Sequence, residues 1–176
     1  MENEYLEIFL ISMLPVTELR LSVPLGISCY ELNWLYVYVA AILGNFLICI
    51  PIVYFFNYFE TILKKNKYAA IALKKIFSRT RSKSRVINKY KYYGIVLFVG
   101  IPLPFTGAWT GSLASYLFGF KKKKTLIAIF VGLLISATAV TIISVFLEHL
   151  LTYIGYDLCE AGLNIFIHIS NIYYEK

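Results

Sequence analysis

The sequence predicts an all-α integral membrane protein made of two inverted repeats, each a re-entrant helical hairpin followed by a transmembrane helix. Hydrophobic residues make up 59% of the chain and charged residues 15%, whereas a soluble domain carries roughly 25% charged residues. This composition excludes a soluble enzyme. The 15 tyrosines and 13 phenylalanines exclude a disordered chain, which is poor in aromatic residues. The order of the apolar segments and the placement of the charges predict the rest of the architecture.

Two segments, 34–56 and 125–147, contain no charged residue over their whole length. About 20 apolar residues cross the hydrocarbon core of a bilayer, so both are predicted to be transmembrane helices. Aromatic residues stand at both ends of the first segment, as expected for side chains at the two membrane interfaces.

Two other apolar segments, 5–30 and 94–120, are interrupted in the middle. The first contains Pro15 and Pro24, and the second contains two prolines and two glycines close together. Proline removes a helical hydrogen bond and glycine permits turns, so each segment divides into two short arms. An arm of about ten residues covers about 15 Å at helical rise, which is half a bilayer. Two such arms are predicted to form a re-entrant hairpin whose tip lies near the middle of the membrane.

The basic residues form two blocks. Eleven of the 17 lie between Lys64 and Lys91, in a predicted loop at 57–93, and four more form the run 121–124. Four full spans would place these blocks on opposite sides of the membrane, whereas two re-entrant hairpins place them on the same side. Because cytoplasmic loops are enriched in Lys and Arg, we favour the hairpins. Both basic blocks are then cytoplasmic, and both termini, including an amphipathic tail at 148–176, are external.

We therefore expect a single membrane domain over residues 1–176, in the plasma (inner) membrane of a bacterium. The richness in Lys, Ile, Asn and Tyr is typical of an AT-rich bacterial genome. The basic loop is expected to contact anionic lipid headgroups as a surface helix, or else to be a solvated run that only fixes orientation. Because the lysine clusters flank membrane segments, nucleic acid is not expected as a partner.

The two interrupted segments share a short motif. Leu-Pro-X-Thr occurs at 14–17 and again at 103–106, and residues 34–56 shifted by the same offset overlap the second span. Gly44 falls near Gly132 under this shift. Because the second half starts from the opposite face of the membrane, the two repeats have inverted topology. This arrangement is typical of secondary transporters, whose broken helices meet near the midplane.

Glu18 and Arg20 lie in the middle of the first hairpin. An ionisable residue inside a membrane is costly and marks a functional site by default. We predict that Glu18 carries a proton, because desolvation favours the protonated carboxyl. Arg20 is predicted to bind an anionic group or to keep Glu18 ionised. The alternative is a structural ion pair that only closes the tip of the hairpin.

The tip of the second hairpin carries no charge, but broken helices offer backbone groups that coordinate substrates and ions. It also offers threonine hydroxyls and the ring of Trp109, which can receive a cation. The alternative is close packing of the two arms across glycines, with Trp109 filling volume. The predicted substrate or backbone site comprises Pro15, Thr17, Pro104, Thr106, Gly107, Trp109, Thr110 and Gly111.

No metal or cofactor is predicted. Cys29, Cys49 and Cys159 have no metal-ligand or redox spacing, so they are expected to be small apolar fillers. The two histidines stand outside any metal-binding pattern. We find no phosphate-binding loop, nucleophile elbow or kinase signature, so an enzyme is not expected.

The two hairpin tips resemble the motifs of a known family. Residues 14–20, Leu-Pro-Val-Thr-Glu-Leu-Arg, with Pro24 and Gly26 after them, are similar to the first motif of the Putative small multi-drug export protein family. Residues 102–111, Pro-Leu-Pro-Phe-Thr-Gly-Ala-Trp-Thr-Gly, are similar to the second. Phe105 departs from the pattern, because the family usually has a small residue there. The resemblance implies distant kinship with the DedA/VTT superfamily, whose paired re-entrant hairpins and charged residues are associated with proton-coupled transport or lipid translocation.

From these features we expect a proton-coupled membrane transporter with an unidentified substrate, whose site forms where Glu18 and Arg20 meet the second hairpin. Two full spans do not easily enclose a path, so we expect a homo-oligomer, most simply a dimer. Two alternatives stay open. A lipid translocase of the DedA/VTT type would use Arg20 to engage a phosphate headgroup, and a non-transporting scaffold would use its hairpins only for packing.

Overall fold

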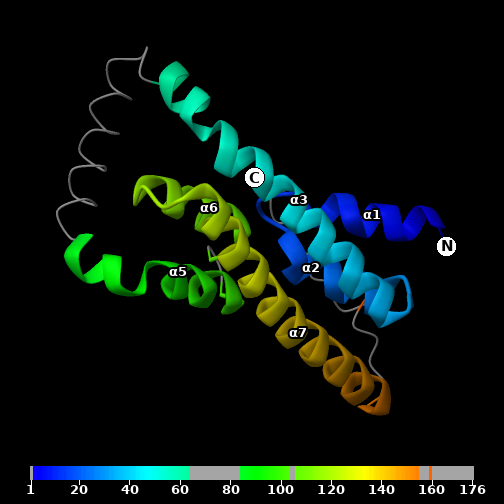
Figure 1. Cartoon of the computed structure of the whole chain (residues 1–176). Coiled ribbons are helices and arrows are strands. Elements are labelled where there is room, and N and C mark those ends of the chain that lie inside the picture. Colours follow the sequence, from blue (N-terminus) through cyan, green and yellow to red (C-terminus); the bar gives the residue numbers. More distant parts are fainter. Residues whose placement is uncertain (1, 64–83, 104–105, 155–158, 160–176) are drawn as a thin grey trace, which may run out of the picture.

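The computed structural model describes residues 2–63, 84–103, 106–154 and 159 (Figure 1). In this part of the chain every regular element is a helix, which confirms the predicted all-α class. The elements in chain order are α1 (Glu2–Ser12), α2 (Glu18–Pro24), the π-helix η1 (Leu25–Cys29), α3 (Trp34–Leu63), α5 (Ser84–Gly100), α6 (Ala108–Leu117) and α7 (Lys122–Ile154).

The two longest helices are α3 and α7. Both contain stretches apolar and long enough to cross a membrane, Trp34–Phe55 in α3 and Lys122–Ile154 in α7. Each helix also leaves large apolar side chains exposed along one face, such as Leu43 on α3 and Ile142 on α7. Soluble proteins rarely expose contiguous apolar surface of this extent. Together these features identify both helices as transmembrane, as the sequence predicted.

The transmembrane helices run antiparallel, side by side (Figure 1). The Tyr38 hydroxyl lies 3.2 Å from the Thr138 hydroxyl, and the rings of Phe46 and Phe130 meet edge to face at 5.1 Å. Tyr38, early in α3, thus faces Thr138, late in α7, and the later Phe46 faces the earlier Phe130, as in an antiparallel pair. At 1.5 Å per residue α7 is roughly 50 Å long, so it extends beyond a hydrocarbon core of about 30 Å.

Each interrupted segment folds as two helices joined at the predicted break. In the first half α1 ends at Ser12 and α2 begins at Glu18. In the second half α5 ends at Gly100, after a change of direction at Tyr90, and α6 begins at Ala108. The helices α1 and α2 pack on α3, and α5 packs on α7. Buried side chains such as Ile8, Val37, Val99 and Ile129 form the core between them.

The helices extend beyond the predicted membrane segments. The segment 57–93 is not wholly a loop, because α3 continues to Leu63 and α5 starts at Ser84. The second span begins inside the lysine run and extends to Ile154, since Lys and the residues after 147 are compatible with a helix that reaches past the bilayer core. The second arm of the first segment runs through Pro24 and continues as η1 to Cys29, within the predicted segment 5–30. Residues 64–83 and 160–176 lie outside the described residues.

A glycine allows each short helix to approach its transmembrane helix. A Cβ atom on Gly44 would overlap the carbonyl oxygen of Phe9 in α1. A Cβ atom on Gly132 would lie 2.8 Å from the Cβ of Val99 and 3.0 Å from the carbonyl oxygen of Val96, both in α5. Gly44 on α3 and Gly132 on α7 thus each lie where another helix packs closely on a transmembrane helix.

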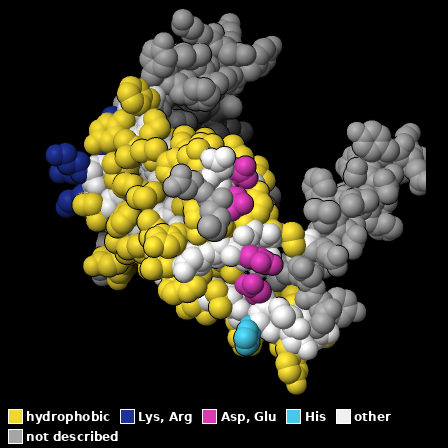
Figure 2. All heavy atoms as spheres, turned by 90° about the vertical axis from the view of Figure 1, so that its right-hand side faces the viewer, with side chains coloured by type: hydrophobic (Ala, Val, Ile, Leu, Met, Phe, Trp, Pro, Cys, Tyr) yellow, Lys and Arg dark blue, Asp and Glu magenta, His cyan; other side chains and the backbone are white. Residues whose placement is uncertain are grey.

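Basic and acidic residues gather at different ends of the molecule. The Lys122 ammonium lies 3.3 Å from the Tyr54 carbonyl oxygen, and Lys124 lies over the Tyr92 ring, so the run 121–124 contacts α3 and α5. At the opposite end of α3, the Tyr30 hydroxyl donates to Glu7 at 2.9 Å. Figure 2 shows Lys and Arg side chains at one edge, acidic side chains and a histidine away from it, and hydrophobic surface between them.

The expectation that all three cysteines are apolar fillers was wrong for two of them. Cys29 and Cys159 form a disulfide that joins the end of η1 to the segment after α7. Their spacing of 130 residues hides this pairing in the sequence, because only the packing of α7 beside the first hairpin brings them together. Cys49 is a free, buried thiol, as expected.

Candidate functional site

The tips of the two helix pairs contact each other. We call residues 13–20 the first tip and residues 101–103 and 106–111 the second tip. The first tip contributes Glu18 and Arg20 at the start of α2, and the second contributes Thr106, Gly107 and Trp109 around the start of α6. Side-chain contacts join these two groups across about half the chain.

The carboxylate of Glu18 lies at the N-terminus of α6. Its Oε1 atom accepts a hydrogen bond from the backbone N–H of Trp109 at 3.4 Å, and a Cβ on Gly107 would overlap the carboxylate. Gly107, the N-cap residue, has no side chain to cap its own helix. The first N–H groups of a helix lack internal partners and attract negative charge. Glu18, only 7% exposed, therefore caps α6 from the other half of the protein.

The backbone of Glu18 is unusual as well. Its φ of 45° lies in the left-handed region, which costs a residue with a Cβ roughly 1 kcal/mol. Such conformations persist only where surrounding contacts hold them, and they concentrate at functional sites. Here the turn between α1 and α2 directs the carboxylate toward α6.

Arg20 also reaches the second tip. Its Nη2 donates to the Thr106 hydroxyl at 3.1 Å, whereas it stands 3.9 Å from Glu18 Oε2, at the outer limit of an ion pair. The shorter polar contacts of both charged residues thus go to the second tip rather than to each other. A pair that only closes the first tip does not describe this geometry.

Two further contacts fix the tips. The Thr106 hydroxyl lies 2.9 Å from the Ile101 carbonyl oxygen and 2.8 Å from that of Leu103, so it donates within its own loop while accepting from Arg20. The indole N–H of Trp109 donates to the Met13 carbonyl oxygen at 3.0 Å. Trp109 therefore ties the second hairpin to the turn after α1 and does more than fill volume.

The other predicted site residues lie apart from this contact. Pro15 is exposed in the turn, and the Thr17 hydroxyl donates to the Ile11 carbonyl oxygen at 2.5 Å, which closes the first tip. Thr110 donates to the Gly107 carbonyl oxygen within α6. A Cβ on Gly111 would lie 2.6 Å from Val99, so this glycine serves close packing of α6 on α5. Pro104 lies outside the described residues.

Sequence reasoning missed a group of buried polar residues near Glu18, on α2, α3 and α6. The clearest sequence signal is Asn45, an amide in the middle of an otherwise apolar span. It is fully buried. The others are small residues that look unremarkable in apolar helices; the group comprises Ser22, Asn45, Cys49 and Ser112.

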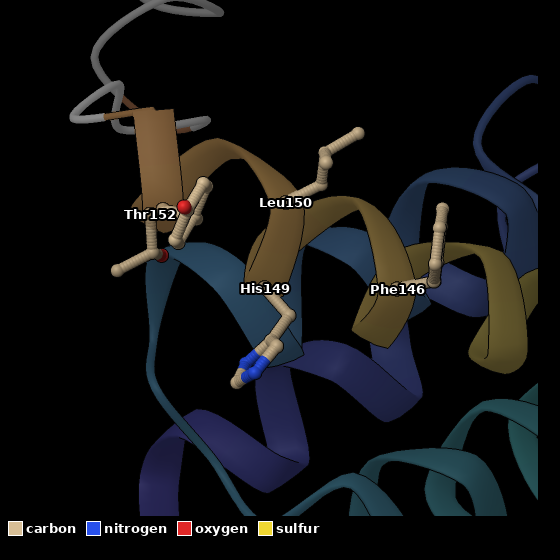
Figure 3. Close-up of a pocket in the computed structure, with 5 residues that line it drawn as sticks. Phe146, His149, Leu150 and Thr152 are labelled. Carbon is tan, nitrogen blue, oxygen red and sulfur yellow. The ribbon is translucent and has the colours of Figure 1, made fainter.

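Two surface grooves lie elsewhere, at the C-terminal end of α7. The first, of about 370 Å³, is lined by one helix end (Figure 3). The second, of about 600 Å³, includes Trp34 and shares Phe146 and His149 with the first. Binding pockets bury most of the surface of their ligand, whereas both of these grooves are open to the surroundings. We therefore place the candidate site at the two tips.

The arrangement at the tips combines a carboxyl that can hold a proton, a guanidinium that stays charged and a helix N-terminus that favours an anion. Within the described ranges no group of three or more His, Cys, Asp or Glu is placed to hold a metal ion. The chemistry on offer is proton and anion binding by side chains and backbone.

Comparisons with known proteins identify the family of the chain. No curated protein and no solved structure matches the chain. The profile of a family described as Putative small multi-drug export protein matches residues 18–152. That range begins at Glu18 and includes α3, the second tip and α7 as far as residue 152. The chain therefore belongs to the Putative small multi-drug export protein family.

Proposed function

We propose that the protein is a proton-coupled exporter in which Glu18 carries the proton. Its family is described as one of export proteins, and it has two transmembrane helices. The observation that carries the proposal is the position of the Glu18 carboxylate. It is buried against the N-terminus of α6 and accepts a hydrogen bond from the backbone N–H of Trp109.

This position links the charge of Glu18 to the contact between the two tips. The ionised carboxylate accepts a hydrogen bond from the Trp109 N–H and attracts Arg20. It is also stabilised by the partial positive charge at the N-terminus of α6. A proton on Glu18 removes the charge and weakens all three interactions, because hydrogen bonds to ionised groups are about twice as strong as neutral ones. Proton binding would then loosen the second tip from the first, which is the rearrangement a coupled transporter needs.

We further propose that the two halves are inverted repeats with re-entrant hairpins. The antiparallel course of α3 and α7 and the equivalent contacts at Gly44 and Gly132 support this arrangement. The proposal places the basic end in the cytoplasm and the two contacting tips near the midplane, where broken helices bind substrates in secondary transporters. It also includes a homodimer, because two spans alone do not enclose a path.

The test uses purified protein in proteoliposomes with an imposed pH gradient. Ethidium serves as a drug-like cationic probe, and a luminal dye reports pH. We expect gradient-driven ethidium movement and proton movement in the wild type, and loss of both in Glu18→Gln. Glu31→Gln is the matched control, because Glu31 is exposed and lies outside the site. Unchanged fluxes in a folded Glu18→Gln variant would end this proposal, whereas the absence of any flux in the wild type would favour the scaffold.

One observation favours a second candidate, a lipid translocase. The Arg20 side chain is 21% exposed, and its guanidinium has five N–H donors. It can therefore bind a phosphate headgroup beside Thr106. A fluorescent headgroup-labelled phospholipid in the same vesicles tests this candidate. Headgroup movement that is lost in Arg20→Ala and occurs without proton flux would support the translocase and not the exporter.

A further inference from the structure

Asn45 is the starting point, because its side chain is buried with nothing to bind. It is 0% exposed, and neither its amide oxygen nor its amide nitrogen has a hydrogen-bond partner among the described residues. Leaving a buried polar group unpaired costs about 1–3 kcal/mol, and native structures keep few such groups. An amide with both ends unpaired in the core of a transmembrane helix therefore points to a ligand.

A second unpaired group lies on the neighbouring helix. The hydroxyl of Ser22 is buried without a partner among the described residues, and Ser22 is also 0% exposed. It stands one turn after Glu18 on α2, on the same face, since residues four apart are neighbours on a helix. The helices α2 and α3 pack on each other.

Cys49 connects Asn45 to the candidate site. Cys49 is one turn after Asn45 on α3, and its thiol donates to the backbone carbonyl oxygen of Asn45 at 3.1 Å. The same thiol lies close to the Ser112 hydroxyl on α6 and to the Glu18 carboxylate. Buried polar groups on α2, α3 and α6 therefore gather on the interior side of Glu18. We call Ser22, Asn45, Cys49 and Ser112 the polar cluster.

The chemistry of Asn45 indicates which ligand fits. An amide has two N–H donors and an oxygen acceptor. A metal cation would satisfy the oxygen but would leave both N–H groups unpaired and facing positive charge. Water accepts from the nitrogen and donates to the oxygen, and buried waters typically make about three such bonds to unsatisfied groups. Ser22, a donor and an acceptor, suits water for the same reason.

We propose that the polar cluster holds ordered water next to Glu18 and that this water is the route by which Glu18 exchanges its proton. The role of this water as a proton route rests on the proposed function, whereas its presence in the polar cluster does not. In the part of the chain that the structure describes, Arg20 and the Cys49 thiol are the titratable side chains that lie close to Glu18. Arg20 stands on the side of the second tip, so the cluster offers a path that does not pass the fixed positive charge.

X-ray hydroxyl-radical footprinting tests for the water directly, because radicals form in place from bound water and oxidise the nearest side chains. Cys49 is a natural reporter: it is the free thiol among the described residues and is fully buried. We expect Cys49 to be oxidised in the folded wild type. A cysteine in Val99→Cys serves as the dry reference, because Val99 is 1% exposed and packs against Gly111 and Gly132.

The Asn45→Leu variant replaces the amide with an apolar group of similar shape, so we expect loss of Cys49 oxidation. Asn45→Ser keeps a polar group and leaves room for water, so oxidation should remain, and it covers the case in which the leucine variant does not fold. Cys49 oxidation no higher than that of the Val99→Cys reference in the wild type would overturn the proposal.

Proton flux in the same proteoliposomes separates this proposal from the proposed function. If the water conducts the proton, Asn45→Leu loses flux while Asn45→Ser retains it. If Cys49 is oxidised in the wild type but Asn45→Leu keeps full proton flux, the water is present and its role as the proton route is refuted. Failure of the proposed function appears separately, as unchanged flux in Glu18→Gln.

Discussion

The carboxylate of Glu18 occupies the space into which a side chain on residue 107 would project, so Glu18 and Gly107 fit together as a pair. The two residues stand 89 positions apart, at matching places in the two halves of the chain. Glycine at 107 lets the carboxylate come within reach of the Trp109 N–H. The pair thus decides how closely the two tips approach.

Replacing Gly107 with alanine should separate the tips. The new Cβ would overlap the Glu18 carboxylate, and overpacking of this kind costs about 1–3 kcal/mol. We expect a lower thermal unfolding temperature in detergent. Gly94→Ala is the control, because a Cβ there meets nothing within 4 Å and alanine in a helix is favoured over glycine by about 0.5–1 kcal/mol. A Gly107→Ala variant as stable as Gly94→Ala would contradict the contact.

Gly44 and Gly132, the two glycines at close helix contacts on α3 and α7, should both resist substitution. Alanine at 44 would overlap the Phe9 carbonyl oxygen, a backbone atom, whereas alanine at 132 would press mainly on the Val99 side chain. Side chains shift more easily than helix backbones, so we expect both variants to unfold at lower temperature than Gly94→Ala, with Gly44→Ala affected more. The reverse order of stability, measured in the same detergent, would show that the α1–α3 contact is looser than described.

The Cys29–Cys159 disulfide should form in the cell and stabilise the fold. Closing a loop across 130 residues limits the unfolded chain, and native disulfides typically contribute about 2–4 kcal/mol. Thiol counting under denaturing, non-reducing conditions should find one free thiol, Cys49. Reduction, or Cys159→Ser, should lower the unfolding temperature. Three free thiols per chain would refute the bond.

The disulfide and the basic end together predict the sidedness of the chain. Disulfides persist in oxidising compartments, so the Cys29 end is expected outside and the Lys122 end in the cytoplasm. Single cysteines at positions 31, 83 and 122, in a variant lacking the native cysteines, can be labelled in intact cells with an impermeant thiol reagent. We expect labelling from outside at 31 alone, and labelling at 83 and 122 only after lysis. External labelling at 122 would make the second hairpin a full span and would remove the inverted-repeat proposal.

The sequence alone determined the helical class, the two spans and the positions of the breaks. These features depend on local properties: the length of an apolar run, the missing N–H of a proline and the placement of charges. It also singled out Glu18 and Arg20, because charge within an apolar segment is visible without any fold. The ends of the helices were less predictable. The helix α7 includes lysines and other polar residues at its ends, because such residues are compatible with helical structure outside the apolar run.

Only the tertiary structure decided what those residues touch. The capping of α6 by Glu18, the hydrogen bond from Arg20 to Thr106 and the Cys29–Cys159 bond all join positions at least 86 residues apart. Such contacts depend on which face each helix presents and how closely glycines let it approach, and no local pattern encodes them. The unpaired amide of Asn45 belongs to the same class, because a buried polar group becomes a signal only when its neighbours are known.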